Sequence, residues 1–217
     1  MNTIRKILFL TACLWGMNAQ ALDERGQEKL EEIQSEWAEI KYRVSAKEQE
    51  KAFERLDATA QQALAESADA PELLIWRGIV LASWAGAKGG LGALDLVKEA
   101  RSSLEAALER DPSALDGSAW TSLGSLYYQV PGWPIGFGND KRAEEMLHKA
   151  LAINPDGIDP NFFYGDFLLR EGRYDEARPA LLKARAAAPR AGRELADEGR
   201  RREIDALLAQ IEEKTRN

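Results

Sequence analysis

The sequence predicts an all-α fold in which antiparallel helix pairs stack side by side and a cap helix closes the C-terminal end. Three observations support this prediction. Apolar residues recur at spacings of three and four, no segment alternates with period two, and one pattern of Ala, Leu, Ala and Pro occurs three times. The chain has 217 residues, of which 45% are hydrophobic and 30% are charged, a composition typical of globular proteins. A chain of this size can bury a core large enough for one domain without disulfides.

The first 21 residues are typical of an export signal. Two basic residues precede a short apolar stretch, and the segment ends in Ala19-Gln20-Ala21, a small-x-small cleavage pattern. The apolar stretch is shorter than the roughly 20 residues that a membrane-spanning helix requires. We therefore expect cleavage after Ala21 and a periplasmic protein that begins at Leu22. The mass of the mature protein tests this expectation, because a retained Met1 would rule out export.

A lipid anchor is the alternative to cleavage at that site. Leu10-Thr11-Ala12-Cys13 resembles a lipobox, in which Cys13 would become the lipidated first residue. Because Cys13 comes very early and a good cleavage pattern follows, we favour removal of residues 1–21. Cys13 and His148 are the only cysteine and histidine of the chain, which excludes a disulfide framework, a Cys/His zinc site and a Cys–His nucleophile within one chain. The net charge of −7 argues against nucleic-acid binding.

Residues 22–70 are predicted to form two N-terminal helices, which together make a degenerate first repeat. The apolar stripe of the first helix consists of Leu30, Ile33, Trp37, Ile40 and Val44. The second helix should begin at Ser45, because Ser45 and Glu48 have the spacing of a capping box. The apolar stripe of this helix consists of Phe53, Leu56, Ala60 and Ala63. A third helix should begin after Pro71, since proline is tolerated in a first helical turn.

The next three units share one spacing. Each has a glycine in a helical context, followed by Ala, Leu, Ala and Pro at intervals of four, three and five residues. The three sets are Gly78, Ala100, Leu104, Ala107 and Pro112; Gly124, Ala143, Leu147, Ala150 and Pro155; and Gly165, Ala177, Leu181, Ala184 and Pro189. We therefore expect repeats at 71–114, 115–157 and 158–191. A charged cap helix should follow in 192–217, with Ile204, Leu207, Leu208 and Ile211 facing inward.

The second unit resembles a tetratricopeptide repeat. The residues that carry this resemblance are Trp120, Leu123, Gly124 and Tyr127, together with the Ala, Leu, Ala and Pro of its second helix. The resemblance implies a right-handed solenoid in which the first helices line a concave face. The third unit departs from the family pattern at Asn161 and Tyr164, and the first at Leu74. The chain also looks like a group of small periplasmic repeat proteins of Gram-negative bacteria through residues 131–138 and 157–165, which implies no known activity.

Two repeats carry extra residues between their first and second helices. Compared with the third repeat, the first is longer by ten residues and the second by seven, and these insertions include loops at 85–92 and 130–140. The second loop combines Trp133 and Phe137 with Pro and Gly, so it either covers the neighbouring repeat or forms a recognition patch. Covering is the plainer interpretation. For recognition, the candidates are Trp133, Phe137 and Lys88. The first loop lacks the phosphate-binding glycine pattern, so no nucleotide is expected.

The predicted groove supplies the remaining candidate residues. One helix stripe contains Ser118, Thr121, Ser125 and Tyr128, and another contains Asp159, Phe162 and Asp166. Such a groove suits a peptide with apolar and basic or amide groups, or it is merely solvated. We name Tyr128, Phe162 and Asp166 as partner-binding candidates. The C-terminal arginines, including Arg190, Arg193 and 200–202, either belong to a charged cap or contact an acidic partner or phospholipid.

These features favour a non-catalytic exported module or scaffold that binds another protein or peptide. A small apolar-ligand carrier, or accessory component of a transport system, is the alternative; Trp133 and Phe137 would then face inward and close a cavity. A third hypothesis is an enzyme with dispersed acids, which would need two close carboxylates with perturbed pKa values. We expect no metal, cofactor or integral membrane span, while peripheral or lipid-anchored membrane association stays an alternative.

Overall fold

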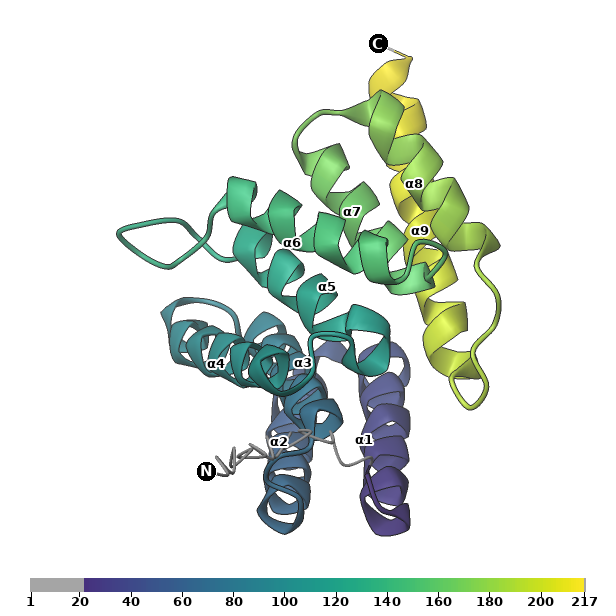
Figure 1. Ribbon diagram of the computed structural model, residues 1–217. Coiled ribbons are helices and arrows are strands. Elements are labelled where there is room, and N and C mark those ends of the chain that lie inside the picture. Colours follow the sequence, from purple (N-terminus) through teal and green to yellow (C-terminus); the bar gives the residue numbers. More distant parts are fainter. Residues whose placement is uncertain (1–21, 217) are drawn as a thin grey trace, which may run out of the picture.

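The computed structural model describes residues 22–216, which form nine α-helices and one short 3-10 helix (Figure 1). The predicted export signal and Cys13 lie outside these residues. The helices are α1 (Glu24–Arg43), α2 (Ala46–Glu66), α3 (Pro71–Lys88), η1 (Leu91–Ala93), α4 (Leu94–Arg110), α5 (Ala114–Gln129), α6 (Asp140–Ile153), α7 (Ile158–Arg170), α8 (Tyr174–Ala186) and α9 (Glu194–Thr215). The all-α prediction is confirmed. Within the described part of the chain, no helix is both long and apolar enough to cross a membrane.

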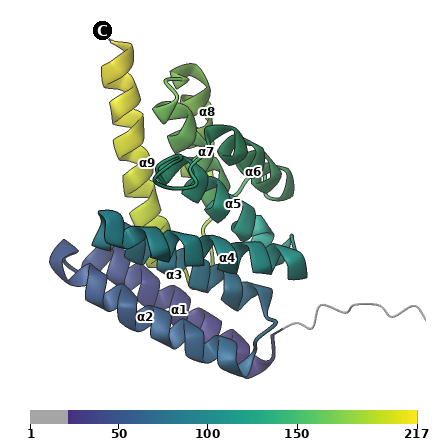
Figure 2. The same ribbon diagram turned by 90° about the vertical axis from the view of Figure 1, so that its left-hand side faces the viewer.

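The helices follow one another as antiparallel pairs. α1 packs on α2, α3 on α4, α5 on α6 and α7 on α8, and α9 follows the last pair (Figures 1 and 2). The first helices of successive pairs also contact each other, since α3 packs on α5 and α5 on α7. This arrangement confirms the prediction of four helix pairs and a cap helix.

Glycine allows the two helices of a pair to approach closely. A Cβ added to Gly78, Gly124 or Gly165 would lie 2.6–2.7 Å from the Cγ of the leucine in the second helix of the same pair. These leucines are Leu104, Leu147 and Leu181, and each is fully buried. Because Cβ atoms are not found at such distances from a side-chain branch point, the three glycines are packing positions. The register predicted from the repeated spacing is therefore confirmed.

The N-terminal helices confirm most of the predicted apolar stripes, with two differences. Val44 is only half-buried, because it is the residue that follows the last turn of α1. Ser45 precedes α2 as expected, but its hydroxyl donates to the Glu48 carboxylate at 2.6 Å instead of accepting a backbone N–H. The predicted capping box is therefore wrong in its geometry. α3 begins at Pro71, as predicted.

The two inserted segments differ from each other. α3 continues to Lys88, so the prediction of a loop over 85–92 is wrong for residues 85–88; Ala85 is buried and extends the apolar face of the helix. The chain leaves the helix at Gly89 and Gly90, which have φ values of 65° and 60°. The second segment forms a loop over 130–139, and Asp140 is already the first residue of α6.

The cap helix α9 covers the last pair and also reaches α1. Ile204, Leu208 and Ile211 are buried and Leu207 is half-buried, which confirms the predicted inward face. The N-terminal half of α9 contacts α1, where Gly199 lies against the Tyr42 ring and the Tyr42 hydroxyl donates to Glu203 at 3.3 Å. α9 therefore connects the two ends of the array, which the sequence did not predict.

Candidate functional site

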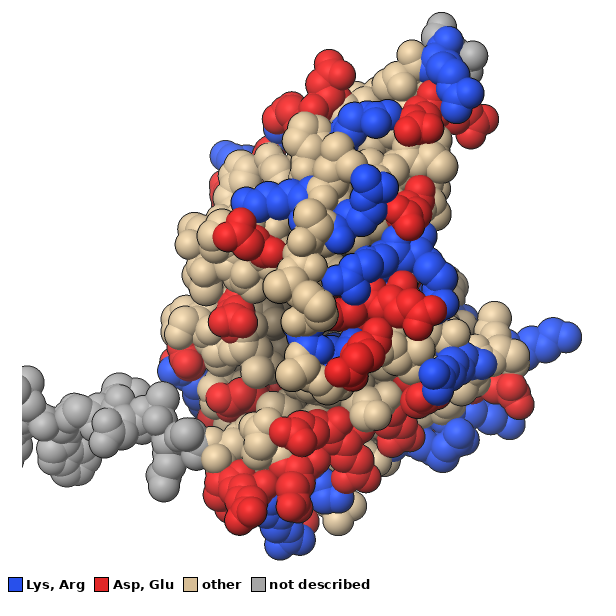
Figure 3. All heavy atoms as spheres, turned by 90° about the vertical axis from the view of Figure 1, so that its right-hand side faces the viewer, with Lys and Arg blue, Asp and Glu red and all other residues tan. Residues whose placement is uncertain are grey.

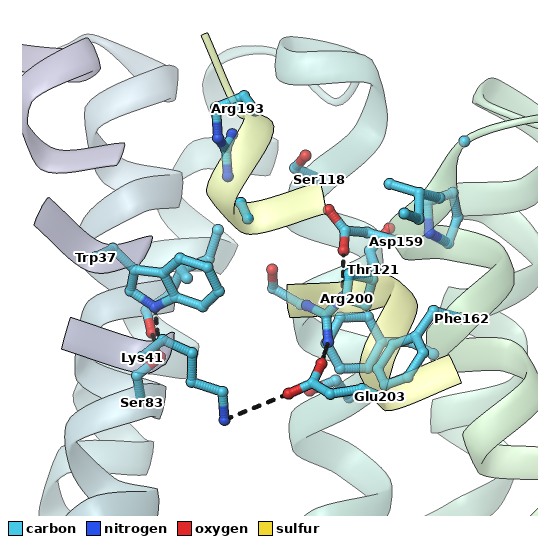
Figure 4. Close-up of a pocket in the computed structure, with 18 of the residues that line it drawn as sticks. Trp37, Lys41, Ser83, Ser118, Thr121, Asp159, Phe162, Arg193, Arg200 and Glu203 are labelled. Carbon is cyan, nitrogen blue, oxygen red and sulfur yellow. Dashed lines mark hydrogen bonds and ion pairs between the residues drawn. The ribbon is translucent and has the colours of Figure 1, made fainter. Parts of the chain in front are cut away.

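A cleft of about 1090 Å³ lies between the inner faces of the helix pairs and α9 (Figure 4). Residues of α1, α3, α5 and α7 line it, together with the start of α2, the segment before α9 and the first half of α9. The aromatic residues of its lining are Trp37, Tyr42, Phe53, Trp76, Phe162 and Phe163. The first helices of all four pairs thus share one surface, and α9 forms its remaining wall.

Edge-to-face pairs of aromatic rings line the cleft on two sides, one pair on α1 and α3 and the other on α7 (Figure 4). The rings of Trp37 and Trp76 meet edge to face, with 5.9 Å between their centres. The indole Nε1 of Trp37 donates to the Ser83 hydroxyl at 2.8 Å, which fixes the ring. Phe162 and Phe163 make a second edge-to-face pair at 5.0 Å. Because these rings are held by neighbours, they offer a rigid apolar surface whose ordering costs little on binding.

Hydroxyl and amide groups of α5 form another side. Ser118, Thr121, Ser122, Ser125 and Gln129 line the cleft. Tyr128 lies behind this wall, because its hydroxyl donates to Asp166 at 2.8 Å and its ring packs on Phe167. Burial, and then the negative charge of Asp166, raise the pKa of Tyr128 well above its ordinary value, so the hydroxyl remains a donor. Tyr128 therefore positions Asp166.

An ionic network crosses the cleft from α7 to α9. The Nε of Arg200 donates to Asp159 at 2.9 Å, and Arg190 reaches the other oxygen of that carboxylate at 2.6 Å. Burial alone would raise the pKa of Asp159, but the charges of Arg200 and Arg190 outweigh it and hold this pKa at about 2. Arg200 also donates to Glu203 at 2.6 Å. Asp159 is thus neutralised within the chain.

The second predicted groove acid is neutralised as well. Asp166 accepts from Tyr128 and lies 3.4 Å from the Nε of Arg170. Since both acids have cationic or donor partners, the structure does not support the prediction that the groove suits basic groups. The ion pairs of Asp159 could not be deduced from the stripe pattern, because Arg190 and Arg200 come from a later segment, whereas the Asp166–Arg170 pair spans only four residues within α7.

The predicted C-terminal cluster of arginines divides into two groups. Arg190, Arg193 and Arg200 line the cleft. The others lie outside it: Arg185 pairs with Asp205, Arg202 with Glu198, and Arg201 donates to the Ala187 carbonyl. The positive charge predicted for the surface is therefore partly internal.

The negative charge of the protein gathers on an outer face. Figure 3 shows Asp and Glu side chains concentrated over the lower part of the molecule, where α1 and α2 lie in Figure 1. On α1 the exposed acids are Glu24, Glu28, Glu31, Glu32 and Glu39. This outer face is therefore acidic, whereas the charged residues of the cleft are mostly held in ion pairs.

The backbone at the start of α5 is strained where it borders the cleft. Leu115, Asp116 and Gly117 have φ values of 47°, 55° and 75°, and regular helix begins only at Ser118. Glycine adopts such angles freely, whereas Leu115 and Asp116 do so at a cost of about 1 kcal/mol or more each. Leu115 and Asp116 both line the cleft, and strain of this kind is often found at binding sites.

The candidate residues of the two insertions lie away from the cleft. Trp133 belongs to the 130–139 loop, which projects from the array in Figure 1, and its side chain is 90% exposed. Phe137 instead packs on the Tyr127 ring at 5.4 Å and beneath the Arg101 guanidinium at 4.4 Å. Phe137 therefore covers a neighbouring part of the array, as one interpretation of this loop predicted, whereas Trp133 does not. Lys88 pairs with Glu50 at 3.3 Å.

The cleft therefore brings together only two of the six predicted site residues, Phe162 and Asp166, with Tyr128 in support. The sequence pattern singled out neither Trp37 nor Trp76 as a site residue, and it indicated Arg193 only as a member of the C-terminal arginine cluster, not as part of the cleft. The tryptophans look like core residues in an apolar stripe, and no local pattern shows that α9 returns to α1. A ligand carrier was expected to have Trp133 and Phe137 facing inward and closing a cavity. Trp133 does not do so, because its side chain points into solvent.

Comparison with known proteins assigns residues 137–211 to a known type of repeat. The tetratricopeptide repeat family model matches residues 137–211, from the end of the α5–α6 loop into α9. No curated protein matches the chain significantly. The matched segment contains the Gly165–Leu181 contact, which is the close approach also seen in the two preceding pairs. Residues 137–211 thus carry a tetratricopeptide repeat domain, a type of domain that generally mediates protein–protein interaction.

Proposed function

We propose that the protein is a non-catalytic, exported binding module that holds an extended segment of a partner protein in the cleft. The observation that carries this proposal is the continuous surface shared by α1, α3, α5, α7 and α9. Its volume of about 1090 Å³ lies just above the range of small-molecule sites, which span roughly 300–1,000 Å³. The serine, threonine and amide side chains of its α5 wall can bond the backbone groups of a peptide.

A small apolar-ligand carrier is the second candidate. The aromatic side formed by Trp37, Trp76 and Phe53 favours it, because such rings line many ligand pockets. The polar α5 wall and the ionic network favour a peptide, which presents both apolar and hydrogen-bonding groups. The proposal that the protein is exported depends on the sequence of residues 1–21.

Photo-crosslinking from within the cleft tests the proposed function. A photoreactive residue replaces Ser125 in the cleft wall, and a second variant carries it at Glu145, an exposed position of α6. In intact cells we expect position 125 to capture a discrete protein, with the crosslink mapping to one short segment of it. Position 145 should not capture that protein. Crosslinks from 125 to a small molecule would instead support the carrier, and equal capture from both positions would contradict a cleft site.

Trp133 is proposed as a second contact with the partner. We expect Trp133→Ala to change the free energy of unfolding by less than about 0.5 kcal/mol, because the side chain is 90% exposed. If the indole anchors the partner, the variant should weaken binding by about 2 kcal/mol, or roughly thirtyfold. Phe137→Ala is the matched comparison, since its packed ring should cost stability. A large loss of stability in Trp133→Ala would show that the indole is structural.

A further inference from the structure

Most charged side chains of the cleft form ion pairs within the described part of the chain. The pairs are Arg200 with Asp159 and Glu203, Arg190 with Asp159 and Asp197, Arg170 with Asp166, and Lys41 with Glu203. Arg193 differs from these residues, because no carboxylate among residues 22–216 lies within ion-pair distance of it. The Nε of Arg193 is buried and has no hydrogen-bond acceptor in this part of the chain.

This orphaned donor belongs to the cleft. Within residues 22–216, four buried side-chain atoms have no hydrogen-bond partner: Glu72 Oε2, Trp84 Nε1, Arg101 Nε and Arg193 Nε. Of their four residues, Arg193 alone lines the cleft. A buried donor without an acceptor is unusual in folded proteins, since most find a partner. The position of Arg193 suggests that the missing acceptor is supplied by whatever enters the cleft.

Packing holds the Arg193 side chain in place. Its guanidinium carbon lies 4.8 Å from the centre of the Trp76 ring, and in Figure 4 the side chain extends into the space between α1 and α5. An arginine held against an aromatic ring can still donate from the edge of its guanidinium plane. Trp76 thus fixes Arg193 without using its donors.

The electrostatic surroundings of Arg193 favour an anion. Burial, and then the positive charge of Arg190, lower the pKa of Arg193 to about 10. The group is still positively charged at pH 7, but its charge is poorly compensated. Asp159 and Asp197 lie in the same region, yet both are bonded directly to Arg190. An entering anion would therefore meet Arg193 without having to displace an existing ion pair.

We propose that Arg193 binds an oxyanion, a carboxylate or phosphate group, of the molecule that occupies the cleft. This inference rests on the proposed function, because it names the chemistry of the segment held there. The planar guanidinium suits both anions, each of which can accept two parallel hydrogen bonds. An apolar side chain next to the anionic group would contact Trp37 and Trp76. The site is built by α9 and the first two helix pairs, so it depends on the return of the cap helix to the start of the array.

Three matched peptides test this inference on the full mature chain. Each is an N-acetylated pentapeptide of leucine and alanine: one has a free C-terminal carboxylate, one a C-terminal amide, and one an amide preceded by phosphoserine. Tryptophan fluorescence reports binding, because Trp37 and Trp76 line the cleft. We expect an anionic peptide to bind about tenfold or more tightly than the neutral one, as a charge-assisted hydrogen bond allows. The carboxylate and phosphate peptides then distinguish the two oxyanions.

Substitutions assign the preference to Arg193. Arg193→Gln should reduce the ratio of anionic to neutral affinity to about one, and Arg193→Lys should retain part of it, because lysine keeps the charge without the planar fork. Arg202→Gln is the control, since Arg202 is an exposed arginine of α9, outside the cleft. Melting curves show whether each variant folds. If Arg193→Gln does not fold, Arg193→Lys carries the test.

The outcomes separate this inference from the proposed function. Equal binding of all three peptides would overturn the oxyanion site and leave the peptide cleft intact. An anionic preference that persists in Arg193→Gln would overturn the assignment to this residue. Binding of acetate or inorganic phosphate at Arg193, without binding of any peptide, would support the oxyanion site and contradict a peptide cleft. Failure of every probe would contradict both.

Discussion

Gly124→Leu should lower the free energy of unfolding by about 1–3 kcal/mol, because it overpacks the contact between α5 and α6. A Cβ at this position would lie 2.7 Å from Leu147 Cγ and 3.3 Å from the Ala143 carbonyl oxygen. The leucine side chain adds three more carbons to this space. Loss of the flexible glycine would recover only part of the cost, about 1 kcal/mol. Denaturant unfolding of the two proteins measures the difference.

Gly86→Ala is the matched control for that experiment. Gly86 lies within α3, and no heavy atom approaches within 4 Å of a Cβ built on it. Alanine should therefore stabilise the protein by about 0.5–1 kcal/mol, because it favours the helix over the unfolded chain. Opposite signs at Gly124 and Gly86 would confirm that packing decides the outcome. An unchanged stability of Gly124→Leu would refute the repeat register.

Asp159→Asn should lower the free energy of unfolding by about 2 kcal/mol at neutral pH. The folded pKa of Asp159 is about 2, against an ordinary value of 3.8, because Arg200 and Arg190 favour the charged form. A difference of this size corresponds to about 2 kcal/mol. Since the folded pKa is the lower one, this contribution is present above about pH 4 and is lost as the pH falls toward 2.

The pH dependence distinguishes this effect from a simple loss of packing. Between pH 4 and pH 2, the stability of Asp159→Asn should fall less steeply than that of the natural protein, because one titrating group is gone. Asp156→Asn serves as the control, since Asp156 is 87% exposed in a surface ion pair with Lys183 and should matter little. Identical pH profiles for Asp159→Asn and the natural protein would show that the arginines do not act on Asp159.

Local packing rules explain why the repeat array could be predicted from the sequence. Gly124 and Leu147 lie on helices that are neighbours in the chain, and the requirement for close approach leaves a fixed spacing of small and large residues. Gly78 and Gly165 make the same contact with Leu104 and Leu181, and the Ala, Leu, Ala and Pro that follow keep the same intervals although the segment after each glycine differs in length. Such a pattern is visible without coordinates because each repeat mainly contacts its neighbours.

The cleft could not be predicted in the same way, because it depends on contacts between distant parts of the chain. Gly199 and Tyr42 meet only because α9 returns to α1, and neither residue belongs to a repeated pattern. The stripe that contains Trp37 indicates burial but not which neighbour covers it. The left-handed turn at Leu115 and Asp116 was not predicted either, because leucine rarely adopts a positive φ and Asp116, although aspartate does so more often, does not specify the turn by itself.

The loop at 130–139 shows an intermediate case. Its apolar composition correctly identified an unusual segment, and its two interpretations apply to different residues: Phe137 covers Tyr127, whereas Trp133 remains exposed. Composition describes the whole loop. The division between covering and exposed rings depends on the path of its backbone, which the composition does not specify.

Filling the cleft tests the central claim most directly. Ser122→Trp places a large ring in the α5 wall, and Glu109→Trp places the same ring on the exposed surface of α4. Both variants should fold, as judged by their melting curves. Affinity for the protein captured from position 125 is then compared with that of the unmodified chain. We predict that Ser122→Trp weakens binding at least tenfold while Glu109→Trp does not change it; full affinity in a folded Ser122→Trp variant would contradict a binding site in the cleft.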